Sequence, residues 1–579
     1  MQVSHDFVAA SAVFDDDHLV SCAGLVPVMT LAAQTRLPQL LADKINIAAP
    51  RIASGSANPS PKLATVIAGM CVGADSIDDL DVVRSGGMKT LFDGVYAPST
   101  VGTLLREFTF GHARQLESVL REHLAALCRR VDLLPGADGR AFIDVDSLLR
   151  PVYGHAKQGA SYGHTKIAGK QILRKGLSPL VATISTETGA PVIAGARLRA
   201  GKTNSGKGAA RMIAQAVAAA RAAGVTGQIL VRGDSAYGNS VVVAACRRGG
   251  ARFSLVLIKS RAVAAAIAAI PETAWAPVSY PGAVRDPDTG GWISDAEVAE
   301  TTYTAFGSTA NPVTARLIVR RVKDARYPDA LFPVWRYHPF FTDTEEPLDA
   351  ADITHRRHAI IETVFADLID GPLAHMPSGR FGANSAWILC AAIAHNLLRA
   401  VGVLAGGGHA VARGATLRRR IVTLPARLAR PQRTPLALGI SVDHVVAQHD
   451  RIQPTHRPHH LTNRRTGPTG AHRKSWTDQQ IPAAHSRQRP TKPNVAPLRQ
   501  LISGSRLTPS SEQRLAAAPA DDDGDDPFAG WSSARHPCPG RNHRSLPHRR
   551  GSIHAVGFHF EVLGKAAVKR HAIRAQVFA

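Results

Sequence analysis

The chain between residues 141 and 258 alternates short apolar runs with longer stretches whose apolar positions fall on one helical face. Five apolar runs predict β-strands, and they cover residues 141–145, 180–186, 192–198, 229–231 and 253–258. Two stretches predict α-helices: an Ala-rich one at 205–223 and a shorter one at 240–248, which Gly249 follows. The predicted order of elements is therefore β-β-β-α-β-α-β.

This order is that of the ribonuclease H-like fold, so we expect an α/β core. Residues 1–135 are predicted to be mostly helical. Residues 261–345, rich in Pro, Gly and short β-like runs, interrupt the core and are predicted to form a mainly β insert. Two further helices are predicted, one at 354–369 and one from 385 to about 401.

The chain carries a net charge of +24, which suggests a polyanionic partner, with nucleic acid foremost. This charge is unevenly placed: residues 1–100 carry six Lys/Arg against ten Asp/Glu, whereas residues 401–500 carry seventeen against three. The six cysteines are scattered without a C-x-x-C, which argues against a disulfide framework and favours the cytoplasm. No signal peptide is evident, and the apolar stretch 386–404 carries polar residues, so we expect a buried helix and no membrane partner.

Past about residue 430 the apolar periodicity vanishes and Pro, His, Arg, Gln and Ser dominate, which is typical of a disordered tail. We therefore predict a helical N-terminal DNA-binding domain, a ribonuclease H-like core in two parts, an inserted β-rich subdomain and a basic tail of low order. The N-terminal domain covers residues 1–135, and the core covers residues 136–260 and 346–410. The insert covers residues 261–345, and the tail covers residues 411–579.

Three carboxylates fall at related places in the predicted core. Asp146 ends the first strand, Asp234 follows the fourth, and Glu362 lies on the helix that packs over them. Mg²⁺ prefers hard oxygen ligands, and two such ions can activate a water or a 3′-hydroxyl at a phosphodiester. Any one of these acids alone is more simply a solvated carboxylate, so a metal site is indicated only if all three side chains meet.

Several motifs extend this pattern into a family resemblance. They are I-D-V-D-S (143–147), Y-G-H-A-K-Q-G-A-S-Y-G-H-T-K (153–166), V-R-G-D-S-A-Y-G (231–238), H-R-R-H-A-I-I-E-T-V-F-A-D-L (355–368) and P-S-G-R-F-G-A-N-S-A-W (377–387). Over roughly residues 10–425 the chain resembles the DDE transposases of bacterial insertion sequences, most closely the insertion sequence 1380 family.

The resemblance implies a cut-and-paste recombinase that binds the inverted-repeat ends of its element and performs strand cleavage and strand transfer. Its metal-binding catalytic triad carries over to Asp146, Asp234 and Glu362. It further implies two Mg²⁺ ions, for which Mn²⁺ can substitute, and double-stranded DNA as partner, both terminal repeats and target. A homodimer on DNA and a bacterial, nucleoid-associated location follow from the same resemblance.

Two departures from the family pattern bear on the site. Related hairpin-forming transposases carry Tyr, Arg and Lys around the Glu, where this chain has His355, His358 and Ile369, so those DNA contacts do not carry over. Asp144 and Asp146 lie on one face of the same strand, and either can supply the first carboxylate. We favour Asp146 because it precedes Ser147, as the family's Asp precedes a hydroxyl residue.

Basic residues near these motifs are candidate DNA contacts, with an ordinary solvated loop as the alternative. They are Lys157, Lys166, Lys170 and Arg174 after the first strand, and Arg356 and Arg357 before Glu362. The aromatic residues between 327 and 341 could stack an extruded base, although a plain hydrophobic core for the insert is the simpler interpretation.

A second motif, Gly201 to Lys207, matches the phosphate-binding pattern G-x-x-x-x-G-K and lies between a predicted strand and helix. The next position is Gly208, so the hydroxyl that binds Mg²⁺ in such loops is missing. An ATPase is therefore a minor alternative. A domesticated transposase that binds DNA without cutting it is another.

Overall fold

The computed structural model describes residues 16–48, 55, 57–92, 94–167, 170–279, 283–288, 290–327, 330–429 and 437–440. All of these belong to one compact unit of the chain. Residues beyond 440, and with them most of the predicted tail, lie outside this description.

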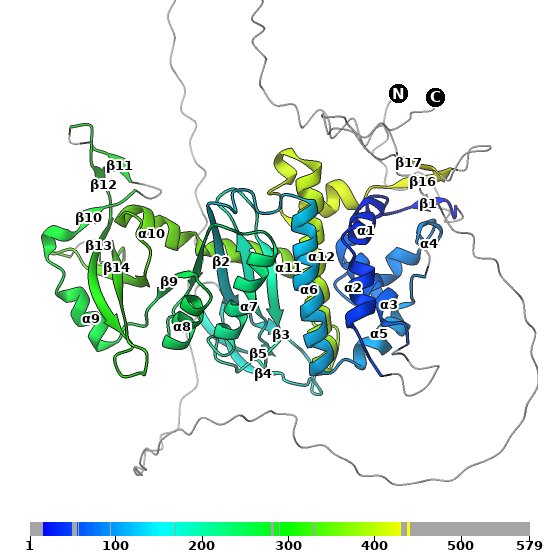
Figure 1. The fold of residues 1–579 in the computed structure, drawn as a ribbon, viewed down its shortest axis with the longest axis horizontal. Helices are drawn as coiled ribbons and strands as arrows, with labels where there is room; N and C mark the ends of the chain where they lie inside the picture. The colour runs from blue at the N-terminus through cyan, green and yellow to red at the C-terminus, as the bar shows by residue number, and fades with distance from the viewer. Residues whose placement is uncertain are drawn as a thin grey trace, which may run out of the picture. The chain divides into compact units, whose positions relative to one another are not determined.

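A nine-stranded mixed sheet organises this unit, in the order β10-β13-β14-β15-β9-β8-β2-β6-β7 (Figure 1). Five of its strands form the predicted core: β2 (Arg140–Ser147), β6 (Leu180–Ser185), β7 (Val192–Arg197), β8 (Gln228–Gly233) and β9 (Arg252–Val256). β2, β6 and β7 pair antiparallel, whereas β2, β8 and β9 pair parallel. The apolar runs form strands because the sheet buries them, and every residue of β6 is buried.

The helices between these strands are those that the sequence predicts. α7 (Ala209–Ala222) connects β7 to β8, and α8 (Ser240–Arg248) connects β8 to β9. Asn239 caps α8, since its side chain accepts a hydrogen bond from the Val242 N–H. The element order β-β-β-α-β-α-β is thereby confirmed, and the core is a mixed α/β structure as expected.

A small sheet is inserted between β2 and β6. Its strands are β3 (Arg150–Pro151), β4 (Ser161–Ile167) and β5 (Lys170–Leu177), with β4 and β5 forming an antiparallel hairpin. Gly201 packs against this sheet so closely that a Cβ there would lie 2.2 Å from the Ser161 carbonyl oxygen. The absence of a side chain at Gly201 therefore lets the loop after β7 reach the hairpin.

The predicted insert extends the core sheet instead of forming a separate one. β13 (Ala296–Ala305), β14 (Val313–Lys323) and β15 (Trp335–Thr342) are consecutive antiparallel neighbours, and β10 (Ala276–Pro277) pairs at the outer edge. β15 pairs antiparallel with β9, with Phe341 opposite Leu255. α9 (Arg261–Ala268), the short η2 (Glu272–Ala274) and the small pair β11 (Val284–Arg285) and β12 (Trp292–Ile293) complete the insert.

The N-terminal segment is helical, as predicted, and packs around one long helix. Its elements are α1 (Leu25–Gln34), α2 (Leu37–Lys44), α3 (Pro59–Val72), η1 (Asp78–Arg84), α4 (Met88–Leu91), α5 (Pro98–Arg106) and α6 (Phe110–Arg130). α12 (Phe381–Ala405) contacts α3, α5, α6 and β7, and Figure 1 shows it beside α6. By length and composition α12 could cross a membrane, but 83% of its apolar window is buried inside the protein, as expected of a core helix.

A buried carboxylate ties α6 to the sheet. Glu117 accepts hydrogen bonds from Arg197 of β7 at 3.1 and 3.0 Å and forms a further ion pair with Arg114. Burial raises the pKa of Glu117 to about 7 in spite of the neighbouring arginines. The N-terminal helices therefore pack onto the core sheet through a buried ion pair.

The helix predicted at 354–369 is broken into α10 (Leu348–Arg356), the 3₁₀ turn η3 (Arg357–Ile360) and α11 (Ile361–Ile369). The break has a local cause. The Thr354 carbonyl accepts from the Arg232 side chain at 2.9 Å, and the His355 carbonyl lies 2.7 Å from Nδ1 of His358. These are the carbonyls that would accept the N–H groups of the next α-helical turn, so side chains compete with the helix here.

The ordered chain runs past residue 410, where the tail was predicted to begin. α13 (Gly414–Leu417), the π-helical turn η5 (Arg418–Val422) and β16 (Ala426–Ala429) follow α12 after a short 3₁₀ turn, η4 (Gly407–His409). β16 pairs with β1 (Leu19–Val20) and with β17 (Ala437–Ile440). Leu417 and Val422 are fully buried, so the packed structure continues past residue 410.

This packing predicts different outcomes for two truncations. A chain ending after Ala410 loses the buried Leu417 and Val422, at about 1.5–3 kcal/mol each, and should be less stable by several kcal/mol. A chain ending after Pro454 retains the compact unit and should unfold at the same urea concentration as the full chain. Urea titration followed by circular dichroism measures both, and equal midpoints for the two truncations would contradict this assignment.

Candidate active site

Two of the three predicted carboxylates come together at the carboxyl ends of neighbouring parallel strands. In the β2–β8 register Asp144 is the partner of Arg232. Two residues further along each strand stand Asp146, near the end of β2, and Asp234, directly after β8. Glu362 lies in the first turn of α11, which contacts β2. The fold thus brings the predicted residues to one edge of the sheet.

Asp146 is the most buried of the three carboxylates, and the charges of the other two act on it. The pKa of Asp146 rises to about 7, first because its carboxyl is largely buried and also because Asp234 and Glu362 add negative charge. The Ser147 backbone N–H opposes this rise, since it donates to the carboxylate at 2.6 Å. Asp234 and Glu362 are exposed to solvent. A partly buried cluster of like charges favours a cation.

Asp144, the alternative first carboxylate, has a different environment. Its side chain is 1% exposed, and both oxygens accept from Arg232, from Nε at 2.8 Å and from Nη2 at 2.8 Å. Arg232 is equally buried and stacks over Phe142, 4.1 Å from the ring centre. Burial raises the pKa of Asp144, and the adjacent guanidinium opposes the rise. Asp144 is therefore fully occupied by an ion pair.

Two residues beside Asp146 escaped the sequence analysis. Tyr237 is fully buried, and its side chain lies close enough to Asp146 to oppose the rise in the pKa of that carboxyl. Arg199 is 8% exposed and donates to three carbonyls of the loop before α7, those of Asn204, Ser205 and Lys207. Tyr237 is the tyrosine of the motif V-R-G-D-S-A-Y-G (231–238), three residues after Asp234, whereas Arg199 belongs to no motif.

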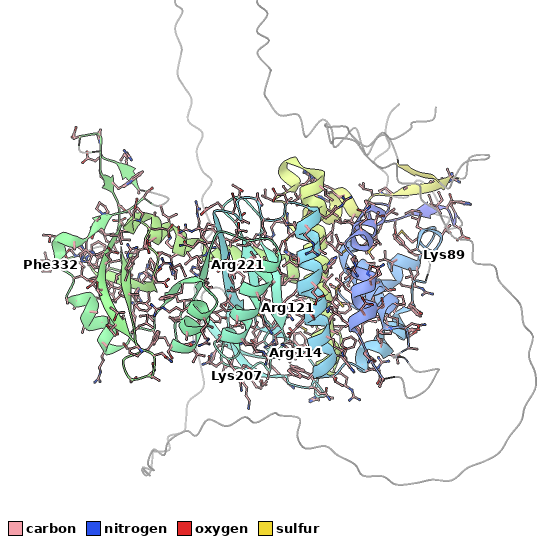
Figure 2. All side chains as sticks on the ribbon, in the orientation of Figure 1. Lys89, Arg114, Arg121, Lys207, Arg221 and Phe332 are labelled. Carbon is pink, nitrogen blue, oxygen red and sulfur yellow. The ribbon has the colours of Figure 1, made fainter. Side chains whose placement is uncertain are left out.

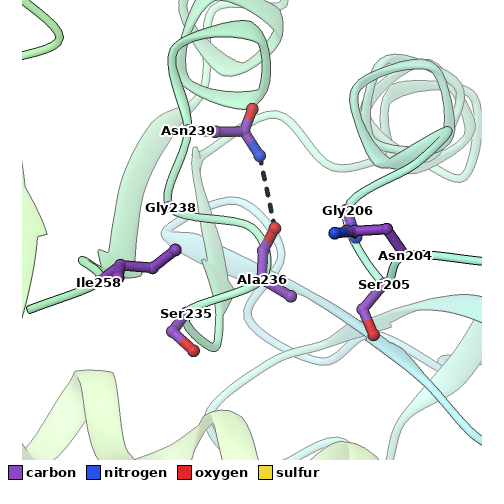
Figure 3. Close-up of a pocket in the computed structure, with 8 residues that line it drawn as sticks. All are labelled: Asn204, Ser205, Gly206, Ser235, Ala236, Gly238, Asn239 and Ile258. Carbon is purple, nitrogen blue, oxygen red and sulfur yellow. Dashed lines mark hydrogen bonds between the residues drawn. The ribbon is translucent and has the colours of Figure 1, made fainter. Parts of the chain in front are cut away.

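A pocket adjoins the carboxylate edge (Figure 3). Its cavity volume is about 430 Å³, and it lies between the loop that precedes α7 and the loop that follows Asp234. Its lining combines the polar side chains of Asn204, Ser205, Ser235 and Asn239 with Gly206, Ala236, Gly238 and Ile258. A hydrogen bond joins the loop before α7 to β2, because the hydroxyl oxygens of Ser147 and Ser205 are 3.1 Å apart. The pocket therefore lies against Ser235, the residue that follows Asp234.

The phosphate-binding motif at 201–207 does not form a phosphate cradle. Such a loop needs free backbone N–H groups, but the N–H groups of Lys202, Thr203, Gly206 and Lys207 all donate within the protein. Arg199 meanwhile holds the loop carbonyls. Lys207 itself is exposed and is labelled in Figure 2. The geometry of this loop therefore does not favour an ATPase.

The family of the chain follows from a comparison with known protein families. Residues 6–450 match the model of transposase DDE domain group 1, which is more than half of the chain. The chain belongs to the DDE transposases. No curated protein matches it.

For this transposase family a divalent metal is the typical cofactor, and the donor set at the sheet edge fits such an ion. Its donors are carboxylate oxygens, the ligands that Mg²⁺ and Mn²⁺ prefer. Among the described residues no three His, Cys, Asp or Glu side chains are gathered tightly enough to hold one ion together. Each divalent ion would therefore take fewer than three carboxylate ligands from the described residues, and water and substrate oxygens would complete its coordination.

Of the predicted DNA contacts, four lie in or beside the β4–β5 hairpin. Arg174 is exposed on β5 and Lys157 is half-buried in the segment before β4. Lys166 and Lys170 lie at the end of the hairpin, opposite Gln171 and Ile167, and their side chains are outside the described structure. The same hairpin exposes Tyr162 and Leu173, which stand on one face of it.

The other two predicted contacts are arginines with acidic neighbours. Arg356 is 3.8 Å from the buried Asp352, and Arg357 bonds to Glu187. Both keep more than a third of their side chain exposed. In contrast, His355 is buried and stacks on Phe340 with ring centres 4.1 Å apart. His355 is therefore part of the core in this structure.

The aromatic residues of the insert divide between core and surface. Phe340 and Phe341 are buried, whereas Tyr327 and Phe332 are exposed, the latter by 74% (Figure 2). Trp335 stacks on Arg321, whose guanidinium lies 4.4 Å from the ring. Part of this run is thus ordinary core, as the simpler interpretation holds.

The occupied N–H groups of the 201–207 loop predict that the protein does not bind ATP. Isothermal titration with ATP and Mg²⁺ should give no heat of binding up to millimolar nucleotide. Micromolar affinity that is lost in Lys207→Ala would contradict this geometry and restore the ATPase alternative.

Proposed function

We propose that this transposase binds the inverted-repeat ends of an insertion sequence of the 1380 family and catalyses metal-dependent strand cleavage and strand transfer. The proposal is supported by the places of the three carboxylates: Asp146 and Asp234 stand at the carboxyl ends of the parallel strands β2 and β8, and Glu362 lies on α11, which contacts β2. The strand order β7-β6-β2-β8-β9 is the arrangement expected of a ribonuclease H-like core.

In this proposal Asp146, Asp234 and Glu362 are the metal ligands, for two Mg²⁺ ions or for Mn²⁺ in their place. Bound ions of this kind activate a water or 3′-hydroxyl and stabilise the leaving oxygen of the phosphodiester. Asp146 is preferred to Asp144 because both oxygens of Asp144 are bound by Arg232 in the interior. The exposed Asp234 and Glu362 leave the site open to a DNA strand.

The residues around the site fit a strand of DNA in several ways. The pocket beside Asp234 is lined by hydroxyl and amide groups that can hydrogen-bond to a sugar–phosphate backbone. The β4–β5 hairpin adds positive charge and exposed apolar groups. We propose that it contacts double-stranded DNA through Lys157, Lys166, Lys170 and Arg174, with Arg356 and Arg357 as further contacts and a homodimer as the assembly on DNA.

The first prediction of this proposal concerns the carboxylates. Asp146→Asn, Asp234→Ala and Glu362→Ala should each reduce cleavage of a duplex with the element end by about 10³-fold or more, because each removes a ligand needed for transition-state charge stabilisation. Each variant should bind the same duplex with unchanged Kd. EDTA should abolish wild-type cleavage, and Mn²⁺ should restore it.

Cleavage and gel-shift assays on matched protein preparations measure both properties. Lys89→Ala provides a surface control, because Lys89 is exposed and forms only a long ion pair of 3.8 Å with Asp17. Wild-type cleavage by Asp234→Ala or Glu362→Ala would disprove the triad. Greater damage in Asp144→Asn than in Asp146→Asn would move the first ligand to Asp144.

The second prediction concerns the hairpin. Arg174→Gln should lower the slope of log Kd against log salt concentration by about 1, because one phosphate contact is lost. Arg221→Gln is a matched control, since the Arg221 guanidinium donates to the carbonyls of Val225 and Gly227 at the end of α7. Fluorescence anisotropy across a salt series measures the slopes. An unchanged slope in Arg174→Gln would remove Arg174 from the DNA interface.

A further inference from the structure

One buried guanidinium joins three segments of the core. Arg232 on β8 donates through Nε and Nη2 to both oxygens of Asp144 on β2. Its remaining terminal nitrogen, Nη1, donates to the carbonyl oxygen of Thr354 near the end of α10 at 2.9 Å. The Phe142 ring covers one face of the guanidinium. Arg232 therefore fixes two strands and one helix with respect to one another.

Each of these three segments leads directly to one carboxylate of the proposed site. Asp144 stands two residues before Asp146, Arg232 stands two residues before Asp234, and Thr354 stands eight residues before Glu362. The network therefore contains one point on each chain segment that carries a metal ligand. No other side chain among the described residues is shown hydrogen-bonding to all three segments.

The energetics of burial indicate what such a network contributes. Desolvation offsets much of the attraction between two buried charges, and apolar residues of similar volume often stabilise a fold equally well. The planar guanidinium, however, fixes direction as well as distance, which a lysine ammonium does not. The contribution of Arg232 is therefore geometric more than energetic.

The end of α10 needs such an anchor because the helix stops there. His355, the next residue, is held by the Ser254 hydroxyl at 2.9 Å and by stacking on Phe340. The 3₁₀ turn η3 then joins α10 to α11, with Glu362 in the first turn of α11. The position of Glu362 therefore depends on where α10 ends.

We propose that Arg232 is a positioning residue for the metal site: with Asp144 it sets the relative placement of Asp146, Asp234 and Glu362. This inference rests on the proposed function, because it assigns those three carboxylates to metal binding. Arg232 touches none of the reacting groups in this role. It acts through the backbone of β2, β8 and α10.

The test uses the full chain and the variant Arg232→Lys, which keeps the charge but loses the planar three-way bonding. Mn²⁺ binding to the DNA-free protein is followed by electron paramagnetic resonance, and cleavage of an end-bearing duplex is measured against Mn²⁺ concentration. We expect Mn²⁺ affinity to fall by about 10–100-fold, as for other residues that orient metal ligands. Cleavage should recover in part at high Mn²⁺, and the Kd for the duplex should not change.

Arg399→Lys is the matched control. Arg399 is also buried and donates to backbone carbonyls, those of Ala410 and Ala412, but it lies on α12 away from the carboxylates. The Arg399→Lys variant should lose thermal stability, as Arg232→Lys does, but it should keep the wild-type affinity for Mn²⁺. A merely structural role for Arg232 would give the two variants the same Mn²⁺ affinity, and that result would overturn the proposal.

Two further outcomes are decisive. If Arg232→Lys does not fold, Asp144→Asn, which keeps an acceptor oxygen for Arg232, replaces it with the same expected loss of Mn²⁺ affinity. Failure of both variants to fold would assign the pair to stability alone and reject a positioning role. Absence of Mn²⁺ binding and cleavage in the wild-type protein would instead reject the proposed function.

Discussion

The parallel pairing of β2 with β8 is the constraint on which the rest of this structure depends. Strands that run in the same direction end at the same edge of a sheet, and this register places Asp146 and Asp234 at one level. The chain between these strands has to cross over, and it does so through β6, β7 and α7. The same crossover places the 201–207 loop and its pocket beside Asp234.

The insert is built onto the same sheet as the core. Its three long strands continue the core sheet through β15 and β9, so their hydrogen bonds extend the scaffold that supports the site. α10 then leaves β15 and returns to Arg232 before α11 begins. A long insertion can thus separate Asp234 from Glu362 by more than a hundred residues without loosening their arrangement.

The sequence predicted the core strands and helices well, because their apolar periodicity reflects burial that the sheet provides. Asp146 lies on a strand, Asp234 directly after one and Glu362 on a helix, as the same periodicity predicts. The sequence could not show the break before α11, since that depends on Arg232 reaching Thr354 from a distant strand. The pairing of β15 with β9 and of β16 with β1 likewise depends on contacts far apart in the chain, which periodicity does not encode.

The most direct test of the account is to locate the metal itself. Crystals of the protein soaked in Mn²⁺ allow the ions to be placed by anomalous scattering at the manganese edge. The proposed metal site predicts anomalous peaks bounded by the carboxylates of Asp146, Asp234 and Glu362, with Asp144 still paired to Arg232. Peaks coordinated by Asp144, or Mn²⁺ bound only elsewhere on the protein, would contradict it.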